Sequence, residues 1–476
     1  MTSELHRHVP VAQLDRRRIV IVGAGPTGLG AASRLVEHGL TNVTLIERAD
    51  IAGGLAGSER DPAGFTWDYG GHVQFSHYDH FDRLMDDLLG GEWLHHQREA
   101  WIWMRDRFIP YPFQNNVRHL PPVELLSCLA GFLAARRKPA AVPANFEEWI
   151  RASFGAGVAR AFMLPYNFKV WAWPARELSA HWVGDRVAAV DLRRVLANFV
   201  RRRDDVGWGP NSTFRFPVAG GTGEIWRRLA ARFPAGTIRY GAEVARIDTS
   251  GRRLHLVGGG SEDYDILIST MPIDDFVARS DLDELLPAAA RLRRSTVHVV
   301  GVGLAGPMPA TLRRKCWMYF PEPEVPFYRA TVFSNYAPAN VPEPGRQWSL
   351  MAEVSESPAK PVDRPGLADA VVAGMRRSRL IGPDNAIVSL WQKTLPHGYP
   401  TPSLERDAAL AVLHCALERR HIYSRGRFGA WRYEVSNQDH SLMQGVEVVD
   451  RLLTGAAEPT LGDHHAVNRP RGTTVR

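Results

Sequence analysis

The chain has 476 residues, a formal net charge of +7, 45% hydrophobic residues and 23% charged residues, as in an ordinary globular protein with two or three domains. The basic runs Arg16–Arg18 and Arg201–Arg203 are short and are read as solvated surface, so nucleic acid is not the expected partner. Lysine occurs at only five positions. Because arginine is the better bidentate partner for phosphates, the composition favours a small anionic ligand.

The three cysteines are odd in number and widely spaced, which argues for a reducing compartment and against a disulfide framework or a zinc site. The N-terminus lacks the apolar core of a signal peptide. The longest apolar run, Leu125–Ala135, is about half of the ~20 residues that a membrane span needs. We therefore expect a cytoplasmic, soluble protein with no membrane partner.

Residues 18–48 predict one βαβ unit, with strands at Ile19–Val22 and Val43–Glu47 and a helix between them that ends near Glu37. The glycine turn GxGxxG follows the first strand and opens the helix; its glycines are Gly23, Gly25 and Gly28. This turn predicts a dinucleotide whose pyrophosphate lies at the helix N-terminus. Glu47 follows Gly28 by 19 residues (47 − 28), where an acid holds ribose hydroxyls and favours FAD or NAD over NADP.

A second glycine pair, Gly53 and Gly54, follows the ribose acid. Such a pair is typical of FAD proteins of the amine-oxidase superfamily, where it approaches the cofactor phosphates, and is unusual in NAD dehydrogenases. Amine oxidases generally place an arginine after the pair, whereas this chain has Leu55. The departure counts against an oxidase.

The rest of the chain predicts helices, then short strands, then a sheet and a final helix. The expected helices are 125–136, 146–154 after an Asn cap, 183–203 and 441–455. The expected strands lie within 237–271 and at 297–303, 316–320, 328–334 and 348–355, the last four forming an antiparallel sheet. Residues 459–476 lack periodicity and are expected to be a tail.

The predicted fold class is α/β: a discontinuous Rossmann-like FAD-binding domain with a helical insert and an antiparallel β-sheet domain. The expected segments are 1–95, 219–293 and 421–476 for the FAD-binding domain, 96–117, 206–218 and 294–420 for the sheet domain, and 118–205 for the helical substrate domain.

The segment Gly70–Phe81 combines a glycine pair with several histidines. Paired glycines let backbone approach a ligand closely. His72, His77 and His80 could be metal ligands, but their spacing matches no helical H-x-x-x-H pattern and no cysteine accompanies them. We expect no metal and favour a loop that faces a flavin.

Eight blocks of sequence, in order between Val20 and Asp450, resemble the eukaryotic-type UDP-galactopyranose mutases of fungi and protozoan parasites. They are GGHVQFSHYDHFD, RFIPYPFQNN, PYNFKVWAWP, GDRVAAV, GPNSTFRFPVAGGTGEIW, CWMYFPEPEVPFYRATVFSNY, HGYPTPSLER and SRGRFGAWRYEVSNQDHSLMQGVEVVD. The resemblance implies FAD, active as FADH2 and reduced by NADPH or NADH, and a UDP-sugar substrate. It also implies an isomerase that interconverts UDP-galactopyranose and UDP-galactofuranose through a flavin N5–sugar adduct, so that the cofactor does the chemistry. A homo-oligomer is compatible with it.

The resemblance also implies a role for each matching residue. The catalytic residues would be His72, through its backbone carbonyl, with Arg186 and Arg329 on the substrate diphosphate. The cofactor-binding residues would be Gly23, Gly25, Gly28, Glu47, Gly53, Gly54, Gly70, Gly71, His72, Val244, Arg427, Asn437, Gln438 and Ser441. The substrate-binding residues would be Phe75, Tyr111, Gln114, Asn167, Trp171, Arg186, Asn211, Trp317, Tyr319, Arg329, Tyr336, Tyr399 and Tyr433.

The sequence leaves three alternatives open. The same chemistry could act on a different nucleotide sugar, since Gln74 stands where the family suggests an aliphatic residue. The chain could be an FAD amine oxidase or desaturase, against which Leu55 and the paired arginines argue. It could also be a non-catalytic flavoprotein that binds nucleotide sugars.

Overall fold

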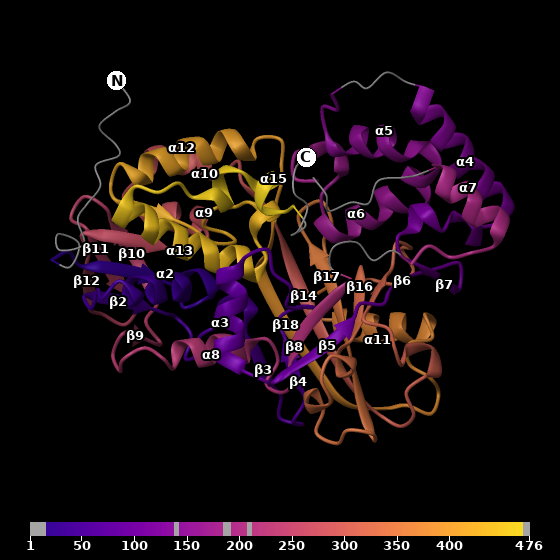
Figure 1. Cartoon of the computed structure of the whole chain (residues 1–476), viewed down its shortest axis with the longest axis horizontal. Coiled ribbons are helices and arrows are strands. Elements are labelled where there is room, and N and C mark those ends of the chain that lie inside the picture. Colours follow the sequence, from indigo (N-terminus) through magenta and orange to yellow (C-terminus); the bar gives the residue numbers. More distant parts are fainter. Residues whose placement is uncertain (1–15, 138–141, 184–191, 207–211, 470–476) are drawn as a thin grey trace.

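A computed structural model describes residues 16–137, 142–183, 192–206 and 212–469. Three parts are distinguishable in Figure 1: a parallel sheet with helices on both faces, a group of helices, and a large mixed sheet. The predicted positions of Arg186 and Asn211 lie outside the described residues.

The parallel sheet has the strand order β19-β13-β1-β2-β9. The strands are β1 (Ile19–Val22), β2 (Val43–Ile46), β9 (Ile238–Arg239), β13 (Ile266–Ser269) and β19 (Ile422–Ser424). All four residues of β1 are buried: Ile19 and Ile21 pack on one face and Val20 and Val22 on the other. A strand covered on both faces needs such a continuous apolar run, and the βαβ prediction is confirmed here.

Helices cover one face of this sheet, and helices with a small sheet cover the other. The first face carries α2 (Pro26–Glu37), α3 (Asp79–Leu89), α8 (Gly223–Ala230) and α13 (Gln438–Thr454). The second carries β10 (Val244–Asp248), β11 (Arg253–Leu256), β12 (Ser261–Asp263), α9 (Ile273–Ala278), α10 (Leu286–Ala289) and α12 (Arg406–Glu418).

The mixed sheet has seven strands in the order β18-β14-β17-β16-β15-β6-β7. They are β6 (Ala100–Met104), β7 (Arg107–Pro110), β14 (Arg293–Ala305), β15 (Trp317–Tyr319), β16 (Arg329–Val332), β17 (Gln347–Glu356) and β18 (Ala386–Thr401). Helix α11 (Leu367–Arg377) packs on one of its faces. The four strands expected to form an antiparallel sheet, β14, β15, β16 and β17, do pair antiparallel, so that prediction is confirmed. The sheet is mixed because β6, at its other end, pairs with β15 in parallel.

The helical part comprises α4 (Pro122–Arg137), α5 (Phe146–Val158), a π-helical turn (Ala159–Met163), α6 (Leu164–Trp171) and α7 (Leu192–Arg201). Asn145 caps α5 by accepting the Glu148 N–H at 3.0 Å, as predicted. The helix expected from Val183 begins in the described residues only at Leu192, and Val183 itself is not helical.

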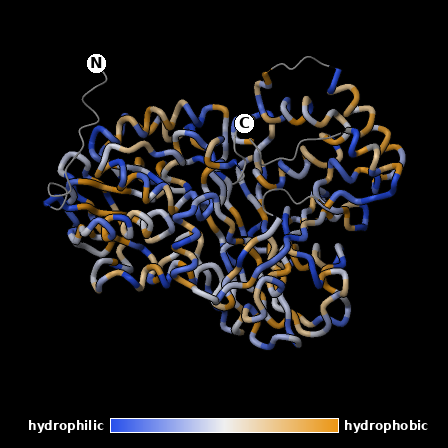
Figure 2. Tube along the Cα trace, viewed as in Figure 1, coloured by the Kyte–Doolittle hydropathy of each residue, from blue (hydrophilic) through white to orange (hydrophobic). Residues whose placement is uncertain are grey.

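Two pairs of short strands join these parts: β3 (Ser58–Arg60) with β4 (Thr66–Asp68), and β5 (Trp93–Gln97) with β8 (Thr213–Pro217). The expected tail is wrong through residue 469, since α14 (Pro459–Gly462) and α15 (His464–Val467) follow α13. Thr460 of α14 is fully buried and donates to Glu447, which explains why sequence without periodicity is still ordered. Apolar segments recur along the whole trace (Figure 2), and no helix in the described ranges is both long and apolar enough to cross a bilayer.

Candidate active site

The glycine turn after β1 leaves the N-terminus of α2 open. Gly23 has a φ of +101°, which favours glycine, and its N–H donates to the Ile46 carbonyl at 2.7 Å. Gly25 is the N-cap of α2 and provides no side chain to the first turn. A Cβ on Gly54 would lie 3.2 Å from the Gly25 Cα, so the two predicted glycine turns touch through bare backbone. The N–H groups in the first turn of α2 have no side-chain cap and lie beside this bare backbone, which suits an anion.

Glu47 lies at the end of β2, as predicted, and is buried. Its carboxylate accepts the Ala24 N–H at 2.7 Å and the Ala49 N–H at 2.8 Å, so it also fixes the glycine turn. The Glu47 carbonyl accepts the Ala242 N–H at 2.9 Å, which brings the start of β10 and Val244 to the same edge. The predicted nucleotide residues therefore gather around one helix end.

One face of the mixed sheet carries a row of predicted site residues. In the strand register, Trp317 is opposite Thr331, Tyr319 is opposite Arg329, and Arg329 is opposite Glu353. Residues in register, and those two apart on one strand, share a face. The sheet thus places an arginine, an acid and two aromatic rings side by side.

The Gly70–His72 turn lies directly against this row. The Gly71 N–H donates to Glu353 Oε1 at 3.0 Å, and the His72 N–H donates to the Gly70 carbonyl at 2.8 Å. A Cβ on Gly71 would lie 3.0 Å from Thr331 Oγ1 and 3.1 Å from Trp317 Nε1. A side chain at Gly71 would require these neighbours to shift by a few tenths of an ångström, so the close packing favours glycine there.

Two guanidinium groups flank the Trp317 ring. The Arg329 Cζ lies 5.3 Å from the ring centroid and the Arg98 Cζ lies 5.1 Å from it, and both side chains are largely buried. Glu353 holds Arg329 by two hydrogen bonds, from Nε at 2.8 Å and from Nη2 at 2.7 Å. Arg98 was not predicted; a lone arginine before a strand carries no signal in the sequence. Glu353 was not predicted either, because a single acid within a strand carries no signal of its own.

Aromatic rings form a wall that joins all three parts of the chain. Tyr433 packs against Trp171 at 4.8 Å and Tyr399 at 5.8 Å between centroids, and the hydroxyls of Tyr328 and Tyr399 lie 3.3 Å apart. Tyr319 lies 5.6 Å from Tyr111 in the same way. The structure therefore brings together the predicted residues of the helical part, the sheet and the C-terminal segment.

The start of α13 meets the predicted flavin loop. The Gln74 amide donates to Gln438 Oε1 at 2.8 Å, and His77 bonds Asp439 through its backbone N–H at 3.0 Å and its Nδ1 at 2.7 Å. Asn437 is the N-cap of α13, and its carbonyl accepts the Ser441 N–H at 2.9 Å. The side chain of Gln74 is thus held by α13, and His77 joins the loop to the same helix.

The other predicted residues lie near this region. Arg427 donates to the Gly398 carbonyl at 2.9 Å and lies 5.2 Å from the Tyr399 ring. The Asn167 amide donates to the carbonyl of Met163, the N-cap of its own helix, at 2.7 Å. Gln114 and Tyr336 are buried, and Phe75 packs edge-on against His77 at 5.4 Å.

His72 is expected to make stability depend on pH. Burial lowers the pKa of His72 to about 4; Glu353 opposes this shift, while the charges of Arg427 and Arg329 add to it. An unfolded histidine has a pKa of about 6.5, so between about pH 6.5 and pH 4 the unfolded state binds a proton that the folded state does not. The free energy of unfolding is therefore undiminished above about pH 6.5 and decreases as the pH falls to about 4. Allowing for partial exposure of the ring, we expect a loss of about 2 kcal/mol, measured by urea unfolding from pH 7 to 4.

The His72→Gln variant should lose this part of the pH dependence. The exposed His95→Gln variant is the matched control and should retain it. Equal slopes for wild type and His72→Gln would show that the imidazole is not held neutral.

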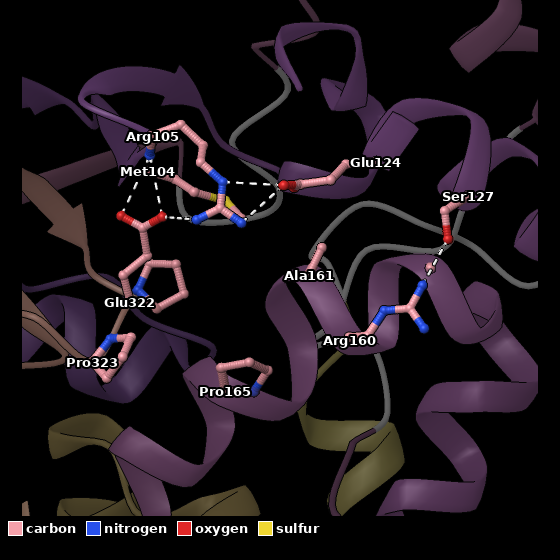
Figure 3. Close-up of a pocket in the computed structure, with 11 residues that line it drawn as sticks. Met104, Arg105, Glu124, Ser127, Arg160, Ala161, Pro165, Glu322 and Pro323 are labelled. Atoms are coloured by element: carbon pink, nitrogen blue, oxygen red, sulfur yellow. Dashed lines mark hydrogen bonds and ion pairs between the residues drawn. The ribbon is translucent and has the colours of Figure 1, made fainter. Parts of the chain in front are cut away.

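A separate pocket of about 300 Å³ lies between the helical part and the β6–β7 turn (Figure 3). Arg105 bonds both Glu322 and Glu124 across it, and Arg160 donates to Ser127 Oγ at 2.9 Å. None of the predicted site residues lines this pocket. Ion pairs join Arg105 to the two acids of this pocket, which is distinct from the aromatic wall.

Comparison with known proteins supports one family. The model of the flavin containing amine oxidoreductases matches residues 26–412. A solved structure of a reduced UDP-galactopyranose mutase has 47% sequence identity and a TM-score of 0.92, over 95% of this chain and 97% of that one. Among curated proteins, the FAD-dependent oxidoreductase dbaF of Emericella nidulans is 45% identical over 77 residues, which are 15% of this chain and 16% of that protein.

Two further solved structures share the fold. A fatty acid isomerase from P. acnes has a TM-score of 0.63 at 18% identity, over 92% of this chain and 99% of that one. A putrescine oxidase has a TM-score of 0.62 at 16% identity, also over 92% and 99%. Such identities establish the architecture and leave the reaction to the site.

Proposed function

Because this chain belongs to the flavin-containing amine oxidoreductase family, and within it to the UDP-galactopyranose mutases, we propose that it interconverts UDP-galactopyranose and UDP-galactofuranose. The observation that carries the proposal is the buried Arg329–Glu353 pair against the Gly70–His72 turn. It would place a diphosphate-binding cation beside the backbone that meets the flavin. An amine substrate is protonated near neutral pH, as a lysine side chain is, and such a cation would repel it.

The described residues fit FAD. The two glycine turns and the open N-terminus of α2 would hold the pyrophosphate, and Glu47 would hold the ribose. Val244 would lie at the adenosine end. Near the turn, the buried atoms His72 Nδ1, Trp317 Nε1 and Thr331 Oγ1 have no hydrogen-bond partner among the described residues, as expected of groups that face a ligand. Bound and reduced, FAD supplies a nucleophilic ring nitrogen at this place.

The side chains of the wall would bind and orient the UDP-sugar. Arg329 uses two of its five N–H donors on Glu353, which leaves three for phosphate oxygens. Arg98 would add a second cation. Hydroxyl donors would come from four tyrosines: Tyr319, Tyr336, Tyr399 and Tyr433. Trp317 would line the sugar pocket.

Other residues would complete the two binding sites. Tyr111 and Gln114 would hold the uracil, with Phe75, Asn167 and Trp171 beside them. Near the flavin would lie Arg427, Asn437, Gln438 and Ser441. Arg186 would bind the diphosphate, and Asn211 would bind the substrate. We also propose the eukaryotic-type subgroup, the domain division given above, a cytoplasmic location, NADPH or NADH as the reductant, and a homo-oligomer. Gln74 is held by Gln438, so its position does not favour a different sugar.

The decisive experiment uses purified holoenzyme and UDP-galactopyranose, with product analysis by NMR. Dithionite-reduced enzyme is expected to form the furanose, and oxidised enzyme should be at least about a hundredfold slower because an oxidised flavin is not a nucleophile. Equal turnover in the two redox states would refute the mutase reaction. Tighter competition by GDP than by UDP would indicate another nucleotide sugar, and peroxide release with an amine would indicate an oxidase.

A further inference from the structure

We propose that Glu353 is a positioning residue that couples ligand binding at Arg329 to the Gly70–His72 turn. The inference rests on the proposed function, because it assigns the turn to the flavin and Arg329 to the diphosphate. It adds a residue that contacts neither ligand and acts on both through its hydrogen bonds.

Glu353 joins two structural elements that are remote in sequence. It lies on β17 and is 2% exposed. Its Oε1 accepts the Gly71 N–H at 3.0 Å and Arg329 Nε at 2.8 Å, and its Oε2 accepts Arg329 Nη2 at 2.7 Å and the Tyr328 hydroxyl at 2.6 Å. An ionised carboxylate has about four acceptor positions, so this one is saturated. A movement of any donor must therefore change the other bonds.

The charge state of the pair is fixed. Burial alone would raise the pKa of Glu353, but Arg329 and the hydrogen bonds from Tyr328 and Gly71 lower it below its ordinary value. Burial opposes the charge of Arg329, and Glu353 reverses this effect and raises the Arg329 pKa. Both groups stay ionised, so a bound anion competes with Glu353 for the same guanidinium.

A diphosphate that draws Arg329 toward itself would lengthen the bonds to Glu353. Oε1 accepts from both Arg329 Nε and the Gly71 N–H, so the carboxylate must then change its position. The Gly70–His72 turn must move with it to keep the bond from Gly71. The turn has little room to absorb this change locally, since a Cβ on Gly71 would be within 3.1 Å of both Thr331 and Trp317. The displacement therefore reaches His72, whose N–H bonds the Gly70 carbonyl within the same turn.

The coupling is measurable as a linkage between UDP binding and flavin reduction, without turnover. In wild-type holoenzyme we expect the Kd of UDP to differ about tenfold between the oxidised and reduced states. For a two-electron couple this is a shift of about 30 mV in the flavin midpoint potential at saturating UDP. In Glu353→Gln the difference should fall below about twofold, because the neutral amide no longer pairs with Arg329.

Two further variants make the test specific. Glu353→Asp keeps the charge, but its shorter side chain cannot contact Arg329 and the Gly71 N–H together, so it should also lose the coupling. It serves as well if Glu353→Gln does not fold. Glu356→Gln is the matched control on the same strand: its carboxylate bonds His298 and Arg364, away from the turn, so its coupling should equal that of wild type.

The outcomes separate this inference from the proposed function. Wild-type coupling in both Glu353 variants, or a wild-type Kd that does not change with redox state, would overturn the inference. A wild type that isomerises UDP-galactopyranose but lacks the coupling refutes only the role of Glu353. A wild type with UDP-dependent potential and no isomerisation refutes only the proposed reaction.

Discussion

Arg329→Ala is expected to lower kcat/KM by about a thousandfold, the largest loss of activity among the variants considered. Truncating one member of a buried, hydrogen-bonded charge pair costs about 2–5 kcal/mol, and about 4 kcal/mol corresponds to that factor. The alanine removes the donors that we propose bind the diphosphate, and it leaves Glu353 buried without its cation. Steady-state kinetics of reduced enzyme and the Kd of UDP measure the effect.

Stability should fall in the same variant by about 3–5 kcal/mol, because an unpaired buried carboxylate is costly. Two further variants separate binding from folding. Arg329→Lys keeps a charge but loses the bidentate geometry, so activity should recover only in part. The double variant Arg329→Leu/Glu353→Leu should regain stability and remain inactive. An unchanged KM and kcat in Arg329→Ala would remove Arg329 from the substrate site.

Gly445→Ala is expected to produce the largest structural loss, with most of the bound FAD absent from the purified protein. Gly445 lies on α13, where a Cβ would be 2.0 Å from the Thr27 carbonyl and 2.7 Å from the Ala31 N of α2. Both contacts are backbone, so the two helices must move apart. Because α2 begins at the glycine turn, its shift would displace the proposed pyrophosphate site.

We expect Gly445→Ala to lose about 3 kcal/mol of stability, at the upper end for overpacking. The flavin-to-protein absorbance ratio and thermal unfolding of the purified protein measure the two effects. Gly91→Ala is the matched control, since a Cβ there has nothing within 4 Å. A Gly445→Ala protein with wild-type flavin content and unfolding temperature would show that the helix crossing tolerates the methyl group.

Local sequence patterns determine much of the fold. The strand β1, the glycine turn, α2 and Glu47 lie within thirty residues, and each follows from periodicity, turn chemistry or a fixed spacing. The Asn145 cap and the strands of the mixed sheet are predictable for the same reason. The resemblance to mutases adds residues such as Trp317 and Arg329, which single-residue chemistry could not select.

Tertiary structure alone decided the contacts between distant segments. Gly71 and Glu353 are 282 residues apart, and nothing in either local sequence indicates that they bond. The same holds for Arg98 beside Trp317, Gly445 against α2, and the parallel pair of β6 and β15. Each depends on strand register or helix crossing, which the packing of the whole chain selects. The sequence thus singled out the Gly70–His72 turn and Arg329 as candidate site residues, and the sheet register supplied Glu353, the carboxylate that bonds both.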